Sequence, residues 1–247
     1  MISDRRGVSE AIGFVLVFSL VLLTVSTVFT LGYSGLQDAR DAERVNNAER
    51  AFDVLANNIE DVSARGAPSR GTEIRLAEAR LGSGPPTQIN VSGYHDNGSA
   101  AFSPTGNYSI DPIVYEAEGT RIRYAGGAIV RNQSDGSVML HEPSFVLSED
   151  RAIIPVVQLS VTDREIAGSR TVLVRAERRL RSVDVDEREI DQLEIALTTP
   201  EADRWAAYLD EKDGVSCDPP AGDRVVCETD DPERVTVIHV EIAVSFD

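Results

Sequence analysis

The feature that most constrains this 247-residue chain is an uncharged apolar run near its N-terminus, "AIGFVLVFSLVLLTVSTVFTL", from Ala11 to Leu31. A run of about 20 apolar residues is long enough to cross the hydrocarbon core of a bilayer as a helix. The basic pair Arg5 and Arg6 precedes the run, and acidic residues follow it from Asp38 onward. The positive-inside rule then predicts a single-pass protein with a short cytoplasmic N-terminus and an extracellular remainder.

A cleaved secretion signal is the first alternative to a retained helix. Such a signal has an apolar region of about 7–15 residues followed by a small-residue cleavage site of the A-x-A kind. The run from Ala11 to Leu31 is longer, and the segment "GYSGLQDAR" that follows it matches A-x-A poorly. We therefore expect the mature protein to keep the helix.

The residues just before the run carry a more specific signal, Arg6-Gly7-Val8-Ser9-Glu10-Ala11-Ile12-Gly13. This segment resembles the N-terminal region of archaeal type IV pilins and related pilin-like surface proteins, and the resemblance extends to about Gly35. It implies that residues 1–7 are a leader, a class III signal peptide, which a prepilin peptidase recognises through Arg5 and Arg6 and cuts between Gly7 and Val8. The alternative is an uncut signal anchor.

The same resemblance implies a use for the helix of residues 8–35. It would rest in the membrane and then leave it to pack against other pilin-like subunits, its own copies or different ones. The apolar residues expected to serve both membrane and assembly are Ala11, Phe14, Leu16, Phe18, Leu22, Phe29 and Leu31.

Residues 36–66 continue the helical pattern as an amphipathic stalk. The segment contains no proline before Pro68, and its apolar residues recur at steps of three and four, which places them in one stripe. The stripe consists of Val45, Ala48, Phe52, Leu55, Ile59 and Val62. It predicts either packing on a globular head or a parallel coiled coil that dimerises a membrane receptor, and the small number of heptads favours the head.

From residue 67 to 247 the pattern changes to short alternating runs between turn residues, which predicts an extracellular β-rich head. The clearest run places Ile238, Val240, Ile242, Val244 and Phe246 on one face and His239, Glu241 and Ser245 on the other. Asp135-Gly136 is a hairpin signal. The expected fold class is α+β: a long N-terminal helix and a mostly antiparallel head, as a sandwich or a strongly curved sheet. Residues 120–160 also resemble the extracellular part of uncharacterised pilin-like proteins of halophilic archaea, which implies no chemistry.

One short helix is predicted within the head. Thr199 is a candidate cap, Pro200 fits the first turn, and Gly214 ends the pattern. Trp205 and Leu209 lie one turn apart, so we expect both to be buried against a sheet.

Charge narrows the choice of partners. The net charge is −17 and the pI about 4.6, so a nucleic-acid partner is not expected, because phosphate binding requires a surplus of Lys and Arg. Lys212 is the sole lysine. An acidic chain that uses arginine almost exclusively resembles proteins of halophilic archaea, and an acidic mesophilic protein is the alternative.

Two kinds of covalent feature are predicted outside the membrane. Cys217 and Cys227 form an even, closely spaced pair without C-x-x-C spacing, which in an oxidising exterior indicates a disulfide. Four Asn-x-Ser sequons, at Asn90, Asn97, Asn107 and Asn132, predict glycosylation wherever they lie on exposed loops.

No catalytic group is assigned. The sequence has three histidines, His95, His141 and His239, and contains neither a G-x-S-x-G elbow nor a phosphate-binding glycine loop. The acidic segment from Asp184 to Asp191 lacks the layout of a calcium loop and alternates as a solvated strand edge would. We expect no cofactor, no metal and no enzymatic activity.

The sequence thus favours a pilin-like structural subunit, major or minor, of an archaeal type IV filament or its assembly machinery. The alternative is a binding or sensing module held at the cell surface by an uncut signal anchor.

Overall fold

The computed structural model describes residues 5–102, 107–148, 150–162, 165–230 and 232–247. Within these ranges side chains are described from Ala11 onward, apart from those of Asp38 and Asp230. The chain divides into two compact units, residues 1–46 and residues 47–247. The boundary lies inside the segment 36–66 that the sequence assigns to a stalk, and the second unit is called the head below.

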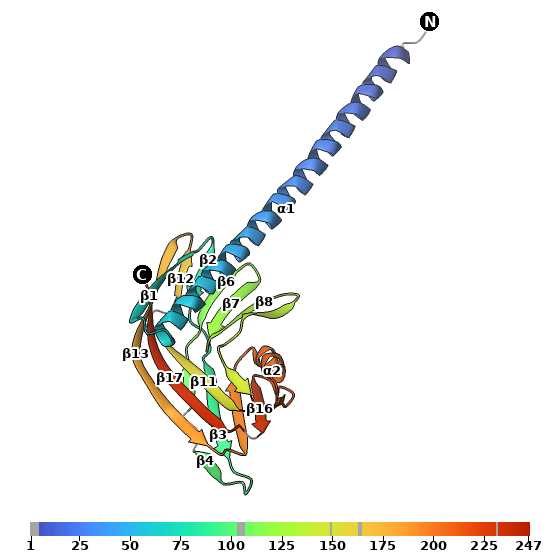
Figure 1. The fold of residues 1–247 in the computed structure, drawn as a ribbon. Helices are drawn as coiled ribbons and strands as arrows, with labels where there is room; N and C mark the ends of the chain where they lie inside the picture. The colour runs from blue at the N-terminus through green and yellow to red at the C-terminus, as the bar shows by residue number, and fades with distance from the viewer. Residues whose placement is uncertain (1–4, 103–106, 149, 163–164, 231) are drawn as a thin grey trace. The chain divides into compact units, whose positions relative to one another are not determined.

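Helix α1 spans Arg5–Ser63, and its residues from 47 onward belong to the head (Figure 1). It ends where the chain reaches Gly66, which has a φ of 89° that other residues rarely adopt. Of the predicted stripe, Val45 is half-buried and the other members are at most 2% exposed: Ala48, Phe52, Leu55, Ile59 and Val62. Packing on the head is therefore confirmed, and these buried residues cannot form the seam of a coiled coil.

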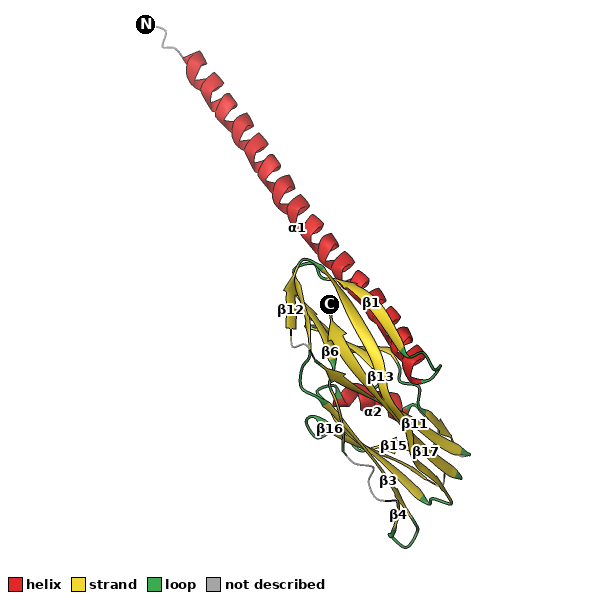
Figure 2. Ribbon diagram, turned by 90° about the vertical axis from the view of Figure 1, so that its left-hand side faces the viewer, coloured by secondary structure: helices red, strands yellow, loops and turns green. Residues whose placement is uncertain are grey.

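The strands of the described residues form three sheets, and the predicted α+β class with a mostly antiparallel head is confirmed (Figures 1 and 2). The first sheet has the order β1 (Ser69–Arg75), β13 (Thr171–Arg188), β17 (Arg234–Phe246), β11 (Arg151–Val161) and β10 (Val146–Ser148). The second has the order β12 (Glu165–Gly168), β2 (Ala79–Gly82), β6 (Ile113–Ala117), β7 (Thr120–Ala125), β8 (Ala128–Gln133) and β9 (Gly136–His141). The third has the order β15 (Val215–Cys217), β16 (Arg224–Asp230), β14 (Gln192–Thr198), β3 (Thr87–Tyr94) and β4 (Ala100–Phe102), and β5 (Tyr108–Ile110) also pairs with β3.

Among the described strands, β11 and β17 form a parallel pair inside an otherwise antiparallel sheet. Figure 1 shows β13 and β17 side by side along their length and curving together. Two register shifts, at Arg178/Leu180 and Val183/Val185, interrupt the β13–β17 ladder. Such bulges bend a strand and increase its twist, so they account for the curvature of this sheet.

The prediction for the last strand is wrong at the first two residues of the predicted run, Ile238 and His239, and is confirmed from Val240 onward. Ile238 is half-buried, whereas His239, expected on the polar face, is only 8% exposed and its ring lies 4.8 Å from that of Tyr108 in β5. From Val240 onward the buried residues are those of the predicted face. The buried face changes sides because this long, twisted strand packs against β5 at one end and presents its opposite face to the core at the other.

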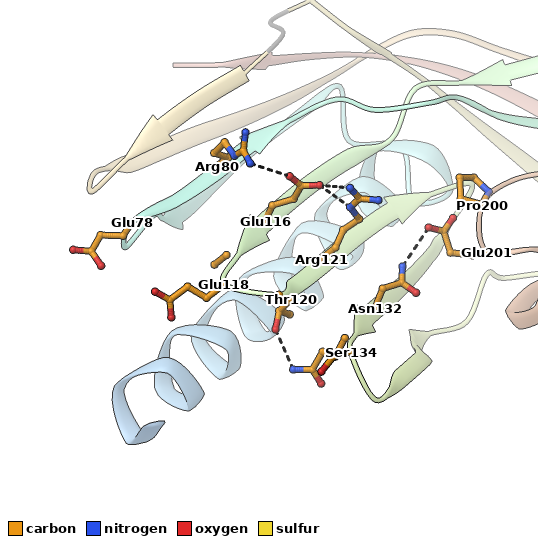
Figure 3. A pocket seen from close by; sticks show the side chains of 13 residues that line it. Glu78, Arg80, Glu116, Glu118, Thr120, Arg121, Asn132, Ser134, Pro200 and Glu201 are labelled. Carbon is orange, nitrogen blue, oxygen red and sulfur yellow. Dashed lines mark hydrogen bonds and ion pairs between the residues drawn. The ribbon is translucent and has the colours of Figure 1, made fainter. Parts of the chain in front are cut away.

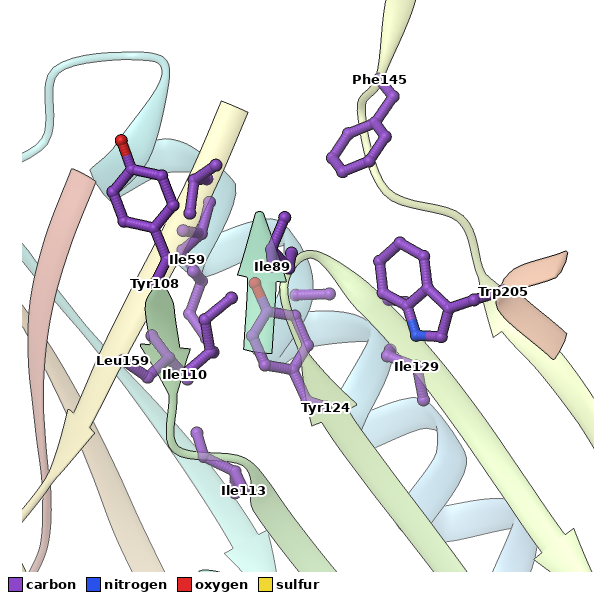
Figure 4. Close-up of a cluster of buried hydrophobic side chains, with 14 of the residues drawn as sticks. Ile59, Ile89, Tyr108, Ile110, Ile113, Tyr124, Ile129, Phe145, Leu159 and Trp205 are labelled. Carbon is purple, nitrogen blue, oxygen red and sulfur yellow. The ribbon is translucent and has the colours of Figure 1, made fainter. Parts of the chain in front are cut away.

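The core of the head is continuous across its elements. Figure 4 shows side chains from α1, β3, β5, β7, β8 and β11 converging, with Trp205 of the second helix and Phe145 beside them. Ile59, Ile89 and Ile110 are 0% exposed, and the Phe145 and Trp205 rings lie 6.0 Å apart. The amphipathic end of α1 is thus a structural part of the head.

Helix α2 spans Ala202–Asp210, and it buries Trp205 and Leu209 as predicted. The predicted cap is wrong, because Glu201 occupies the N-cap position without a side-chain cap hydrogen bond. Thr199 lies two residues earlier, and its hydroxyl donates to the Glu201 carboxylate at 3.0 Å. The helix also ends at Asp210, before Gly214, which has a φ of 75° and lies in the turn that leads into β15.

The hairpin predicted at Asp135-Gly136 joins β8 and β9, where Gln133 pairs with Gly136. Gly136 is the first residue of β9, and the two connecting residues are Ser134 and Asp135. The turn therefore lies one residue earlier than predicted.

Candidate functional site

The first unit presents an apolar helical surface. Among the described residues, one helix is long and apolar enough to cross a membrane, and none of its most apolar window is buried. Its large hydrophobic residues are 50–72% exposed from Ile12 to Leu36. Of the residues predicted to serve membrane and assembly, the structure leaves all of them exposed: Ala11, Phe14, Leu16, Phe18, Leu22, Phe29 and Leu31. An exposed apolar surface of this size marks a site of interaction with a membrane or with another protein.

The threonine hydroxyl groups of this segment, and that of Ser34 just after it, are bonded inside the helix. Thr24, Thr27 and Thr30 each donate to the carbonyl oxygen four residues earlier, at 2.7–2.8 Å. Ser34 donates to the carbonyl oxygens of Thr30 and Leu31. Because an unsatisfied hydroxyl is costly in hydrocarbon, this back-bonding makes the segment compatible with an apolar environment.

The predicted processing site lies at the start of α1. Residues Arg5, Arg6, Gly7 and Val8 have helical backbone, and their side chains lie outside those that the structure describes.

A polar pocket with a volume of about 730 Å³ lies on one face of the second sheet (Figure 3). Its floor is a row of directly paired residues, one from each of four neighbouring strands: Arg80 of β2, Glu116 of β6, Arg121 of β7 and Asn132 of β8. Pro200 and Glu201 stand at one end of the pocket and Glu78 and Glu118 at the other. We call it the Glu201 pocket.

Glu201, which lines one end of the Glu201 pocket, belongs to a buried ion pair. The side chains of Arg123 and Glu201 are each 4% exposed, with Nε of Arg123 3.3 Å from Oε2 of Glu201. Arg123 also donates to the Pro85 carbonyl oxygen and to the Thr87 hydroxyl, both at 2.8 Å. Burial lowers the pKa of the Arg123 guanidinium from its ordinary value, and the Glu201 carboxylate opposes that shift.

Sequence analysis missed this pair, and the reason is specific. Alternation along β7 places Arg123 on the same face as the exposed Arg121, opposite Ile122 and Tyr124. The neighbours of Arg123 in the ladder are Val114 and Val130, both buried. An arginine that lies between two valines on one sheet face would have indicated that its side chain is buried. The sequence does not show this, because it does not show that the three strands are neighbours.

A second polar cluster joins β5, β13, β11 and β17. Asp184 accepts hydrogen bonds from the Tyr108 hydroxyl at 2.5 Å and the Ser182 hydroxyl at 2.6 Å. His239 lies beside it, with Nδ1 3.5 Å from Asp184 Oδ2 and Nε2 2.8 Å from Gln158 Oε1. Burial raises the pKa of the Asp184 carboxyl, but the two hydroxyl donors and His239 outweigh it and hold this pKa below its usual value. These bonds hold the bulge of β13 against β5.

The acidic segment from Asp184 to Asp191 does not gather at one point. Asp186 makes a two-pronged contact with Arg234 at 2.6 Å, whereas Asp191 accepts from the Asp96 amide. In the part of the chain that the structure describes, no group of three or more His, Cys, Asp or Glu side chains could hold a metal ion. The other two histidines lie apart, His95 3.7 Å from Asp191 and His141 3.8 Å from Asp53.

The predicted disulfide between Cys217 and Cys227 is present. The two residues are direct partners in the β15–β16 ladder, and Cys227 is fully buried. The bond therefore fastens the edge strand β15 to the third sheet.

Replacing both cysteines by alanine is expected to lower the free energy of unfolding by roughly 2–3 kcal/mol, since the loop they close is short. Urea unfolding of the detergent-solubilised protein, followed by the fluorescence of the sole tryptophan, Trp205, measures the change. A reducing agent should weaken the wild type by a similar amount and leave the variant unaffected. An unchanged urea midpoint in both experiments would contradict a stabilising role.

The four sequons divide into two groups. Asn97 and Asn107 are exposed and lie outside the strands. Asn90 lies within β3 and Asn132 within β8, both half-buried, and Asn132 donates to Glu201 Oε1 at 3.4 Å. The requirement for an exposed loop is met at the first two sites and not at the other two.

Together these features define a class: a β-rich head whose own amphipathic helix extends from an exposed apolar segment fit for a membrane. The chain belongs to a family of unknown function, DUF7289, whose match covers residues 6–245. No curated protein and no solved structure matches the chain.

Proposed function

We propose that this protein is a pilin-like structural subunit of a type IV filament or of its assembly machinery. The observation that carries the proposal is the exposed, uncharged helical surface from Ala11 to Leu31, directly after the segment "RRGVSE". A polar side chain without a hydrogen-bond partner raises the free energy of a helix in hydrocarbon. The threonine hydroxyls of this helix avoid that cost because they are bonded to its own backbone carbonyl oxygens. A surface of this kind serves equally well against lipid before assembly and against neighbouring helices afterwards.

The proposal assigns a topology and a maturation step. The basic pair Arg5 and Arg6 stays in the cytoplasm, a prepilin peptidase cuts between Gly7 and Val8, and the head is displayed outside the cell. The disulfide supports an extracellular head, because such bonds persist in oxidising surroundings. The partners are the membrane, the peptidase and other pilin-like subunits.

The Gly7→Leu variant is expected to retain its leader and to be absent from surface filaments, because a bulky side chain replaces the small residue at the cut. Intact-mass measurement of the membrane-extracted protein reads the N-terminus, which should begin at Val8 in the wild type. Gly35→Leu is the matched control for processing and should still be cut before Val8, since it lies far along the chain from the cut and nothing lies within 4 Å of a Cβ at this helical position. A wild-type protein that begins at Met1 or Ile2 contradicts processing.

The second candidate is a binding module displayed by an uncut anchor, and the Glu201 pocket is the observation that favours it. Its expected result differs from that of a pilin. Arg6→Gln and Gly7→Leu would leave surface display unchanged, and electron microscopy with peptide identification would find no filament that contains the protein.

A further inference from the structure

The Glu201 pocket offers polar groups at regular positions across four strands. Neighbouring strands lie about 4.8 Å apart in a sheet, so the paired residues Arg80, Glu116, Arg121 and Asn132 form an evenly spaced row. Figure 3 shows this row with its contacts: Glu116 lies between the two arginines, and Asn132 reaches toward Glu201. At the end of the strands Gln133 donates to the Thr120 hydroxyl at 3.0 Å.

Charges in the row are largely neutralised by one another. Nε of Arg121 donates to Glu116 at 2.6 Å, and Arg80 lies 3.8 Å from the same carboxylate. Glu201 is balanced by Arg123 behind it. The lining contains four glutamates and two arginines, a formal charge of −2, which disfavours an anionic ligand.

Apolar ligands and metal ions fit no better. The lining has no aromatic residue, and its residues without a polar side chain are Ala117, Gly119 and Pro200. Most small-molecule sites are predominantly apolar, so this pocket selects for a ligand that is itself polar over its surface. Among the described residues no carboxylate set suits a metal ion.

Paired side chains still have hydrogen-bonding capacity. A guanidinium has five N–H donors and a carboxylate about four acceptor positions, and the contacts described above use only part of them. Both groups are planar and present two parallel positions, which suits neighbouring hydroxyls of one ligand. A row of donors and acceptors held in register by strand pairing is preorganised, which lowers the entropy lost on binding.

We propose that the Glu201 pocket binds a neutral saccharide unit reversibly, with Glu116, Arg121 and Asn132 as its hydrogen-bonding floor. The volume of about 730 Å³ is in the range of small-molecule sites. All of these residues belong to the head, so the inference does not depend on the proposed filament.

A saccharide could reach the pocket from two sources, because Asn132 and Ser134, which line it, are also a sequon. The amide nitrogen of Asn132 would carry a covalent glycan, but this half-buried group donates to Glu201 and lies within a strand. We therefore assign the pocket to a free ligand and not to a glycan attached at Asn132.

The test uses the full-length protein in a zwitterionic detergent that carries no sugar headgroup. The probes are glucose, galactose, mannose, N-acetylglucosamine, maltose and cellobiose, with glucuronate as an anionic probe and putrescine as a cationic one. Saturation-transfer NMR detects binding and calorimetry measures Kd. At least one neutral sugar is expected to bind with a Kd on the order of 1 mM, the range of a weak complex.

Arg121→Met removes donors from the floor of the pocket at a side chain that is 54% exposed. It is expected to weaken sugar binding by at least about tenfold, the effect of losing a hydrogen bond to a charged group. Arg179→Met, at a 59% exposed arginine of β13 in the first sheet that pairs with Glu177 and does not line the pocket, is the matched control and should leave Kd unchanged. The urea midpoints of both variants verify that each is folded.

Each of the following results would overturn the inference: no binding of any neutral sugar in the panel, binding of glucuronate or putrescine alone, or equal Kd values for the wild type and Arg121→Met. Peptide mass spectrometry separates the two sources. A sugar mass on the Asn132 peptide that disappears in Ser134→Ala would show that a covalent glycan occupies the site, and this too would overturn reversible binding.

Discussion

The Arg123→Met variant is expected to lose about 3–5 kcal/mol of unfolding free energy, because removing one partner leaves a buried charge uncompensated. The remaining charge is the Glu201 carboxylate, whose side chain is 4% exposed. Its other bonds, from Thr199 and Asn132, are made by neutral groups that cannot replace the guanidinium. Urea unfolding followed by Trp205 fluorescence measures the loss.

Two further variants give this prediction its controls. Arg121→Met changes an arginine two residues away whose pair with Glu116 is solvent-exposed, and it should cost no more than about 1 kcal/mol. The double variant Arg123→Met/Glu201→Met removes both charges and is expected to recover most of the loss, since apolar replacement of a buried pair is often neutral. Equal losses for Arg121→Met and Arg123→Met would show that the pair is not effectively buried.

Phe52→Ala is expected to destabilise the head by about 3–5 kcal/mol, the usual cost of removing a buried aromatic side chain. Phe52 is 0% exposed, and its ring lies 6.5 Å from that of Tyr115 in an edge-on contact. The cavity would open between α1 and β6, so the loss measures how firmly residues 47–63 are held in the head.

Val54→Ala is the matched control on the same helix, because Val54 is 53% exposed. Its effect should remain within about 0.5 kcal/mol, as for other surface substitutions. If Phe52→Ala were as mild as Val54→Ala, the end of α1 would be a separate stalk and not part of the core. Both variants leave the apolar segment of the first unit unchanged, so membrane association should persist in either case.

The helix shows where sequence reasoning succeeds. Its apolar run and its stripe depend on local properties: the length of a bilayer core and the 3.6-residue period of a helix. Phe52, Leu55 and Ile59 could therefore be assigned to a buried face without knowing what covers them. The disulfide is similar, since two cysteines ten residues apart have few alternatives.

The polar sites show where it fails. His239 was assigned to an outer face because strict alternation assumes that a strand buries one side along its whole length. The long strand β17 changes its buried side, and only contact with Tyr108 of β5 reveals this. Thr199 was assigned as a cap from residue type alone, but its hydroxyl is bonded to Glu201 instead.

The sequence by itself determined the apolar helix, its amphipathic continuation into the head, the β-rich class and the disulfide, because each depends on residues close together in the chain. Only the tertiary structure decided which sheet face is covered. It buried Arg123 beside Glu201 from 78 residues further along the chain and aligned Arg80, Glu116, Arg121 and Asn132 in one row. Strand order and sheet twist set these juxtapositions, and both arise from long-range pairing that local periodicity does not record.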